Sequence, residues 1–116
     1  ACVREHLHLV RRVSYDFDTA RSSEYCLHFS EVLSRSECFG ALGSALNQDF
    51  PDRPDYIISE CKKITPEYQE NCIGVAATQY AFGRQFEKGI MLCRALEEQR
   101  LQDGCLNSVE SARNSL

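Results

Sequence analysis

Apolar residues recur at steps of three and four along most of the chain, which is the spacing of one face of an α-helix. The clearest case is residues 85–97, where Phe86, Ile90, Cys93 and Leu96 fall on one face. No stretch alternates with period two, so we expect no strands and an all-α fold of about seven helices. The expected helices are residues 2–15, a segment carrying Tyr25, Cys26, Phe29 and Val32 or Leu33, residues 36–48, a short segment ending at Cys61, residues 66–82, residues 85–97, and a last helix carrying Leu101, Cys105, Val109 and Ala112.

Polar and helix-breaking residues predict where these helices begin and end. Thr65 followed by Pro66 is the strongest start signal, because threonine is a good N-cap and proline is favoured in the first turn. Gly83 is expected to end the helix over residues 66–82. Two prolines interrupt residues 49–55, which are predicted to be a turn. The other expected N-caps are Asp16 or Asp18, Ser34 or Ser36, and Asp55.

The seven cysteines form two classes, and each class recurs at a nearly constant interval along the chain. One class is Cys26, Cys61 and Cys93, and the other is Cys2, Cys38, Cys72 and Cys105. The shared period, about 34 residues, predicts a solenoid of stacked helical units. We therefore expect one helical-repeat domain over residues 1–116, with phases near 2–37, 38–71 and 72–104 and a partial unit at 105–116. The outer units are less typical, either because end repeats lack a neighbour or because the chain is a fragment of a longer array.

Small residues follow two of the cysteines in the same phase. Cys38 begins CFGALGSAL and Cys72 begins CIGVAATQY, and each has glycine at the second position after cysteine. Small side chains allow a neighbouring helix to come close. We expect the closest helix contacts at Gly74 to Ala77 and at Gly89.

Two disulfide pairings fit the spacing. The favoured set, which has the shorter and more uniform separations, is Cys26–Cys38, Cys61–Cys72 and Cys93–Cys105. The second set, whose separations are about twice as long, is Cys2–Cys26, Cys38–Cys61 and Cys72–Cys93. The shorter arms leave less room for the helices to splay beyond the distance that a disulfide tolerates. Cys2 is then unpaired in this chain, and its expected partner is a cysteine upstream of residue 1; a free thiol, an intermolecular bridge or a lipid anchor would also fit its position.

Composition excludes several classes of protein. The net charge of -4 argues against a nucleic-acid partner, which requires a basic surface. No apolar run approaches the roughly 18 residues of a membrane span. The common zinc sites require closely spaced cysteine pairs, which this sequence lacks. Seven cysteines in 116 residues therefore predict disulfides and an oxidising compartment, the periplasm or the extracellular space.

No residue pattern predicts a catalytic, cofactor or metal site. Asp49, Asp52 and Asp55 suggest calcium, but the intervening prolines do not fit an EF-hand, so we interpret these residues as turn and cap positions. His6 and His8 are two residues apart and point to different sides of a helix, and His28 has no evident partner. We interpret the three histidines as surface or half-buried residues.

The aromatic residues divide by position along the predicted helices. Phe29, Phe39 and Phe86 are expected in the core. Residues near helix ends or loops are the candidate anchors for a protein partner, because exposed aromatic side chains dominate many interfaces. These candidates are Tyr15, Phe17, Phe50, Tyr56, Tyr68 and Phe82.

With these features the chain resembles the tetratricopeptide and Sel1-like class of helical-hairpin repeats, especially its cysteine-rich secreted members. The resemblance covers residues 38–105 and rests on Ile73, Ala76, Ala77, Tyr80, Gly89 and Cys93 in one copy, and on Phe39, Leu42, Gly43, Leu46, Ile57 and Cys61 in another. The tryptophan and the closing proline of the tetratricopeptide pattern are missing. The resemblance implies a protein-binding scaffold.

The sequence thus predicts a non-enzymatic interaction or structural scaffold, stapled by disulfides, that serves as a subunit of a larger assembly. Its partners are expected to be proteins, including a membrane-bound complex, and no cofactor is expected. The competing hypothesis is a small hydrolase or metal-dependent enzyme that uses His6 or His8 with carboxylates from neighbouring helices. A thiol count and a metal analysis would separate the two.

Overall fold

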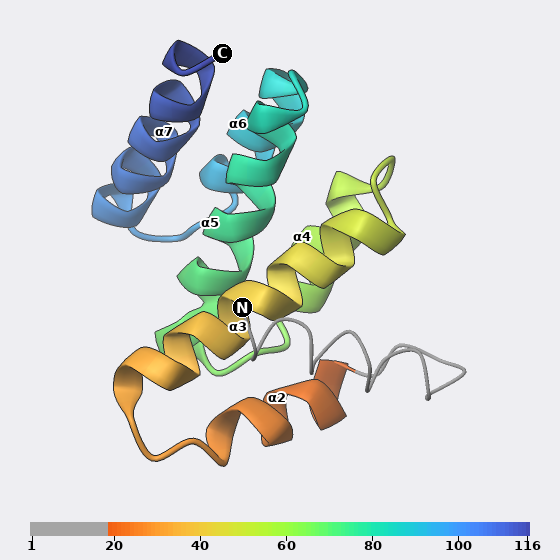
Figure 1. Cartoon of the computed structure of the whole chain (residues 1–116), viewed down its shortest axis with the longest axis vertical. Coiled ribbons are helices and arrows are strands. Elements are labelled where there is room, and N and C mark those ends of the chain that lie inside the picture. Colours follow the sequence, from red (N-terminus) through yellow and green to blue (C-terminus); the bar gives the residue numbers. More distant parts are fainter. Residues whose placement is uncertain (1–18) are drawn as a thin grey trace.

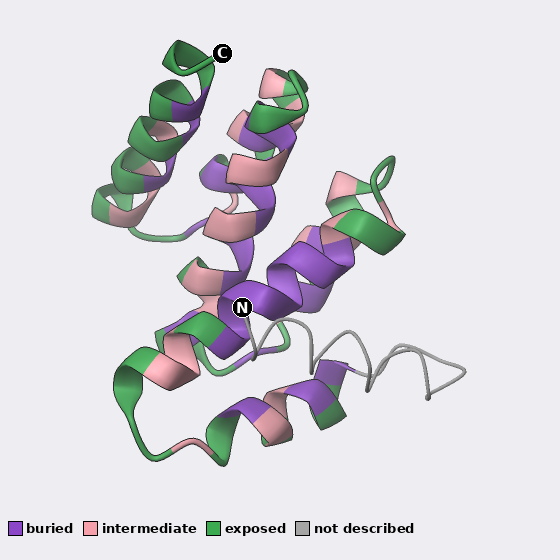
Figure 2. Ribbon diagram, in the orientation of Figure 1, coloured by how far each residue is buried: buried purple, intermediate pink, exposed green. Residues whose placement is uncertain are grey.

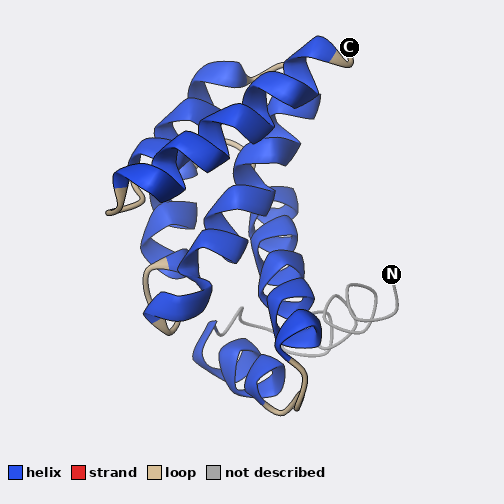
Figure 3. Ribbon diagram, turned by 90° about the vertical axis from the view of Figure 1, so that its left-hand side faces the viewer, coloured by secondary structure: helices blue, strands red, loops and turns tan. Residues whose placement is uncertain are grey.

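The chain is all-α, as its hydrophobic spacing predicts. The computed structural model describes residues 19–116, which form helices joined by short loops, without a strand in this range (Figure 3). The helices are α2 (Thr19–Leu27), α3 (Val32–Asp49), α4 (Pro54–Cys61), α5 (Pro66–Phe82), α6 (Phe86–Arg94) and α7 (Gln99–Asn114) (Figure 1). The helix expected over residues 2–15 and the caps expected at Asp16 or Asp18 lie outside the described residues.

The described helices form a stack of antiparallel hairpins. α3 packs on α5, and α5 packs on α7, so these three helices follow one another through the molecule. α4 and α6 contact each other and both pack against α5. α2 packs on α3 at one end of the long axis, and α7 lies at the other end (Figure 1).

Helix α3 is buried on all sides over nine consecutive residues, Cys38–Leu46 (Figure 2). A surface helix normally buries only one stripe. α5 lies closest to α3, and α2 and α4 also pack on it, so several helices cover these residues. A Cβ atom added to Gly43 would lie only 2.0 Å from the carbonyl oxygen of Cys72, so the two backbones touch where glycine has no side chain.

The predicted positions of closest approach are partly confirmed. A Cβ atom added to Gly89 would lie 2.9 Å from the carbonyl oxygen of Ala77, so α5 and α6 do meet there. The prediction for Gly74 is wrong, because an added Cβ atom would meet nothing within 4 Å. Gly74 faces the space between α5 and α7, where it lines two hollows together with Ser108 of α7.

The boundary between α2 and α3 differs from the prediction. α2 ends at Leu27, and Val32 and Leu33 begin α3 instead of continuing the preceding helix. The turn between them is held by the side chain of Arg35, whose Nε donates to the carbonyl oxygen of Phe29 at 2.6 Å. Spacing alone could not detect this turn, because the three-residue step continues across it.

The other helix ends follow local signals to different degrees. Thr65 is the N-cap of α5 with Pro66 in the first turn, and Gly83 follows its last residue, as predicted. The prediction that helix 85–97 reaches residue 97 is wrong, since α6 ends at Arg94. The remaining cap predictions are also wrong: Ser34 and Ser36 lie inside α3, whose N-cap is Glu31, and Asp55 lies in the first turn of α4, whose N-cap is Arg53.

Candidate interaction surface

Three buried disulfides connect successive helices. The pairs are Cys26–Cys38, Cys61–Cys72 and Cys93–Cys105, with Cα–Cα distances of 5.4, 5.7 and 5.4 Å. These distances lie inside the range that disulfides tolerate, and the pairs are those that the shorter spacing favoured. The second, longer-range set of pairs is wrong, because it would need the same sulfur atoms. Cys2 lies outside the described residues.

Each disulfide closes the connection between two helices that a loop joins. The bonds link α2 to α3, α4 to α5 and α6 to α7, so each of the helices α3, α5 and α7 is tied to the helix before it. Closing a loop of this length stabilises the folded state by about 3 kcal/mol in the chain-entropy model. The bonds therefore restrict how far successive helices can move apart.

The proline turn between α3 and α4 is tied to α5. The hydroxyl of Tyr80 donates to the carbonyl oxygen of Pro51 at 2.8 Å. Burial raises the pKa of the Tyr80 hydroxyl above its ordinary value, and the negative charges of Asp52 and Asp55 raise it further. Both effects disfavour the phenolate, so the neutral donor is the form that holds the turn.

Among residues 19–116, no cluster of three or more acidic, histidine or cysteine side chains is arranged to share a metal ion.

A buried carboxylate that the sequence analysis did not single out joins α2 to α4. The side chain of Glu60 is almost fully buried; it accepts a hydrogen bond of 2.6 Å from the hydroxyl of Thr19 and pairs with Lys63. A buried carboxylate is costly unless it has such partners. The two partners account for the position of Glu60, which we interpret as structural.

The candidate anchor residues separate into buried and exposed side chains. The prediction for Tyr68 is wrong, since it is only 3% exposed and its ring stacks on Phe39 at 4.7 Å. Phe50 and Tyr56 are half-buried against each other at 4.6 Å between ring centroids and against the core. Phe82 is 55% exposed, so it is the candidate that the structure leaves accessible in the described range.

The phenylalanines that were predicted to lie in the core differ in how deeply they are buried. Phe39 is fully buried, whereas Phe29 and Phe86 are only partly buried and pack against the edge of the core. His28 is exposed in the turn after α2. Tyr15, Phe17, His6 and His8 lie outside the described residues.

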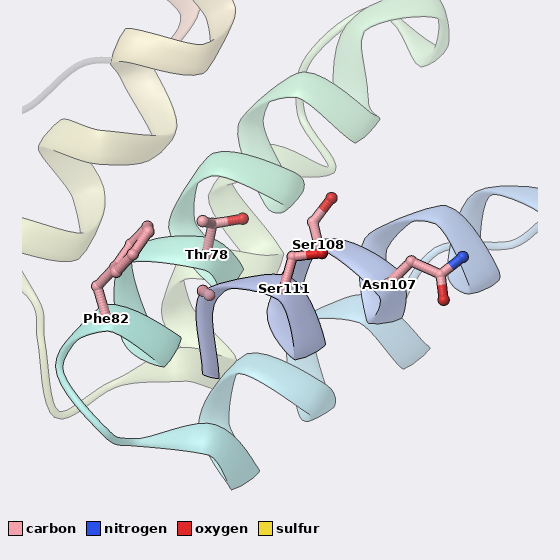
Figure 4. Close-up of a pocket in the computed structure, with 6 residues that line it drawn as sticks. Thr78, Phe82, Asn107, Ser108 and Ser111 are labelled. Atoms are coloured by element: carbon pink, nitrogen blue, oxygen red, sulfur yellow. The ribbon is translucent and has the colours of Figure 1, made fainter. Parts of the chain in front are cut away.

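Phe82 borders a groove between α5 and α7, which we call the α5–α7 groove. Two hollows of about 540 and 380 Å³ share Thr78, Phe82 and Ser108, and a third of about 260 Å³ adjoins them. Figure 4 shows the side chains of Thr78 and Phe82 on α5 and of Ser108 and Ser111 on α7 around one of these hollows. The lining residues on α5 include Glu70, Gly74, Thr78 and Phe82, and those on α7 include Arg100, Gly104, Ser108 and Ser111.

The α5–α7 groove has a mixed polar and apolar lining. Its walls combine small hydroxyl and glycine residues with larger amide and aliphatic side chains and one exposed aromatic ring, and the charges at its edge are those of Glu70 and Arg100. The hydroxyl of Thr78 bonds within its own helix, to the carbonyl oxygen of Gly74. The cysteine phase could have pointed to this groove, because Ser108 occupies the repeat position that Val75 fills one unit earlier.

Comparison with protein-family models, with curated proteins and with solved structures finds no match to this chain. None of the helices in residues 19–116 combines the length and the apolar character needed to cross a membrane. The three disulfides indicate an oxidising compartment. What the described residues establish is therefore a small disulfide-stapled helical protein with an open groove between α5 and α7.

Proposed function

We propose that the chain is a non-enzymatic scaffold that binds another protein through the α5–α7 groove, in the periplasm or outside the cell. In its hairpin arrangement and its period it resembles tetratricopeptide and Sel1-like repeats. The proposal rests chiefly on one observation: the groove lies between helices whose positions are constrained by the buried disulfides Cys61–Cys72 and Cys93–Cys105.

The constraint matters for binding energy. Association costs the ordering of every side chain and loop that becomes fixed at the interface. Each wall of the groove is a helix cross-linked to the helix before it, so the walls lose little freedom when a partner binds and a larger share of the contact energy appears as affinity. Phe82, which is 55% exposed, supplies an accessible aromatic contact at the edge of this surface. Such a chain acts as a subunit of a larger assembly.

Site-specific photocrosslinking in the native host tests the proposal. A photoreactive amino acid at Thr78 lies in the groove, and the same residue at Glu87, which is exposed on α6, serves as the control. We expect a discrete protein adduct from position 78 and none from position 87. The adduct should be lost when Phe82→Ser removes the aromatic edge. Equal adducts at both positions, or none at either, would refute the groove as the binding surface.

A chemical assay addresses the enzyme hypothesis separately. The scaffold requires one reactive thiol in the unfolded, unreduced chain and no stoichiometric metal. Six or seven reactive thiols together with bound zinc would overturn it in favour of a metal-dependent protein.

A further inference from the structure

The contact between α3 and α5 shows how this chain packs one helix on another. A Cβ atom added to Gly40 would lie 3.0 Å from Cγ2 of Val75, so the branch of the valine occupies the space above the glycine. Gly40 is the second residue after Cys38, and Val75 is the third after Cys72. At these repeat positions, the contact between the two helices is therefore made by a branched aliphatic side chain that packs on a glycine.

At the equivalent position of the next repeat, between α5 and α7, the space above the glycine is empty. Gly74 is the second residue after Cys72, and the third residue after Cys105 is Ser108, which lacks the branch of valine. A Cβ atom added to Gly74 would meet nothing within 4 Å, and the same holds for Gly104 on the opposite wall. The α5–α7 groove thus has room above Gly74 for a branched aliphatic side chain from outside.

The chain presents such side chains at its other end. Leu33 is 71% and Val32 is 62% exposed, which makes them the most exposed large hydrophobic residues of the described range. Leu27 nearby is 43% exposed, and we call these three residues the α2–α3 corner. The disulfide Cys26–Cys38 fixes the two helices on either side of this corner. It is therefore ordered before it meets a partner.

We infer that the α2–α3 corner of one copy docks into the α5–α7 groove of a second copy, so that copies associate head to tail. The inference rests on the proposed function, because it takes the groove to be a protein-binding surface. The corner and the groove lie toward opposite ends of the molecule, so they meet only between copies (Figure 1).

Charge and symmetry agree with this contact. Glu31 and Arg35 lie beside the corner, while Glu70 and Arg100 border the groove, so each surface offers both an acidic and a basic group to the other. The two surfaces differ, which makes the interface heterologous, and every added copy leaves one corner and one groove free. Growth therefore continues beyond a dimer.

Analytical ultracentrifugation of the full chain tests the inference. The chain carries Cys2→Ser, so that copies cannot be joined by a disulfide through Cys2. The average mass should rise past that of a dimer between low micromolar and near-millimolar protein. Gly74→Val fills the groove, and Leu33→Ser removes the aliphatic anchor; each should weaken association by about tenfold or more. A Cβ atom at position 74 meets nothing within 4 Å, so Gly74→Val should fold with the circular dichroism of the parent and melt at the same temperature or slightly above it.

Mixing the two variants gives the sharpest outcome. Gly74→Val keeps an intact corner and Leu33→Ser keeps an intact groove, so an equal mixture should form a dimer that neither variant forms alone and should stop there. Ser59→Val and Met91→Ser, which make the same kinds of change on exposed positions of α4 and α6, should leave association unchanged. A chain that stays monomeric, variants that associate like the parent, or a mixture that does not dimerise would each overturn the inference. A monomeric chain that still yields the position-78 adduct with another protein would leave the proposed function standing.

Discussion

Gly43 is the position where one added methyl group should damage the fold most. In Gly43→Ala the new Cβ atom would lie 2.0 Å from the carbonyl oxygen of Cys72 and 2.8 Å from its carbonyl carbon, whereas ordinary contacts begin at 3.4 Å. The obstacle is backbone, and the disulfide from Cys72 to Cys61 ties that backbone to α4, so it cannot give way as a flexible side chain would. α3 and α5 must separate for the alanine to fit.

The expected loss of stability follows from two opposing effects. Overpacking of a tight core typically costs about 1–3 kcal/mol and occasionally more, and the overlap at Gly43 lies at the upper end because it involves backbone. Replacing glycine by alanine inside a helix contributes roughly 1 kcal/mol in the other direction. We expect Gly43→Ala to lower the free energy of unfolding by about 2 kcal/mol or more.

Urea unfolding of the oxidised protein, followed by circular dichroism at 222 nm, measures this difference as a change in midpoint at constant slope. Gly74→Ala is the matched control, because the same change at a helical glycine with nothing within 4 Å should be neutral or stabilising by up to about 1 kcal/mol. If Gly43→Ala unfolds at the same urea concentration as the parent, or if both variants lose equal stability, the close contact of α3 with α5 is refuted.

Three further changes have expected outcomes. Arg84 has a φ of 64°, a backbone conformation that is strained for a residue other than glycine. Arg84→Gly should therefore raise the free energy of unfolding by about 0.5–1 kcal/mol and with it the melting temperature, and a lower melting temperature would contradict this interpretation. Replacing both Cys93 and Cys105 by alanine should lower stability to urea by about 3 kcal/mol, and an unchanged midpoint would show that the bond does not constrain α7. The pKa of Tyr80 is raised on folding, so its contribution is fully present below the unfolded pKa near 10 and is lost as pH rises through the folded pKa. Unfolding of the parent and of Tyr80→Phe between pH 8 and about 11 should therefore show a steeper alkaline loss for the parent, and equal slopes would refute the assignment.

The sequence by itself determined the helical class and favoured, of two possible disulfide sets, the one that the structure contains, because both inferences depend on short-range spacing. Steps of three and four residues define helix faces whatever the fold around them. Cys61 and Cys72 lie on either side of a single turn, and the Thr65–Pro66 pair between them marked the start of α5. These signals act over one or two helical turns, or across a single loop, so they can be read from the sequence without knowing which distant residues are in contact.

Tertiary structure decided which residues are available for contact. Gly43 and Gly74 are both helical glycines, yet a Cβ atom at Gly43 would collide with the backbone of α5 at Cys72, whereas a Cβ atom at Gly74 would meet nothing within 4 Å, because the two glycines face neighbouring helices at different distances. Tyr68 and Phe82 stand at the two ends of the same helix, but only Tyr68 finds a ring to stack on, in α3. Exposure depends on helices that are far apart along the chain, and spacing within one helix does not contain that information. The α5–α7 groove likewise depends on two helices that are distant in sequence, since Gly74 of α5 and Ser108 of α7 both line it.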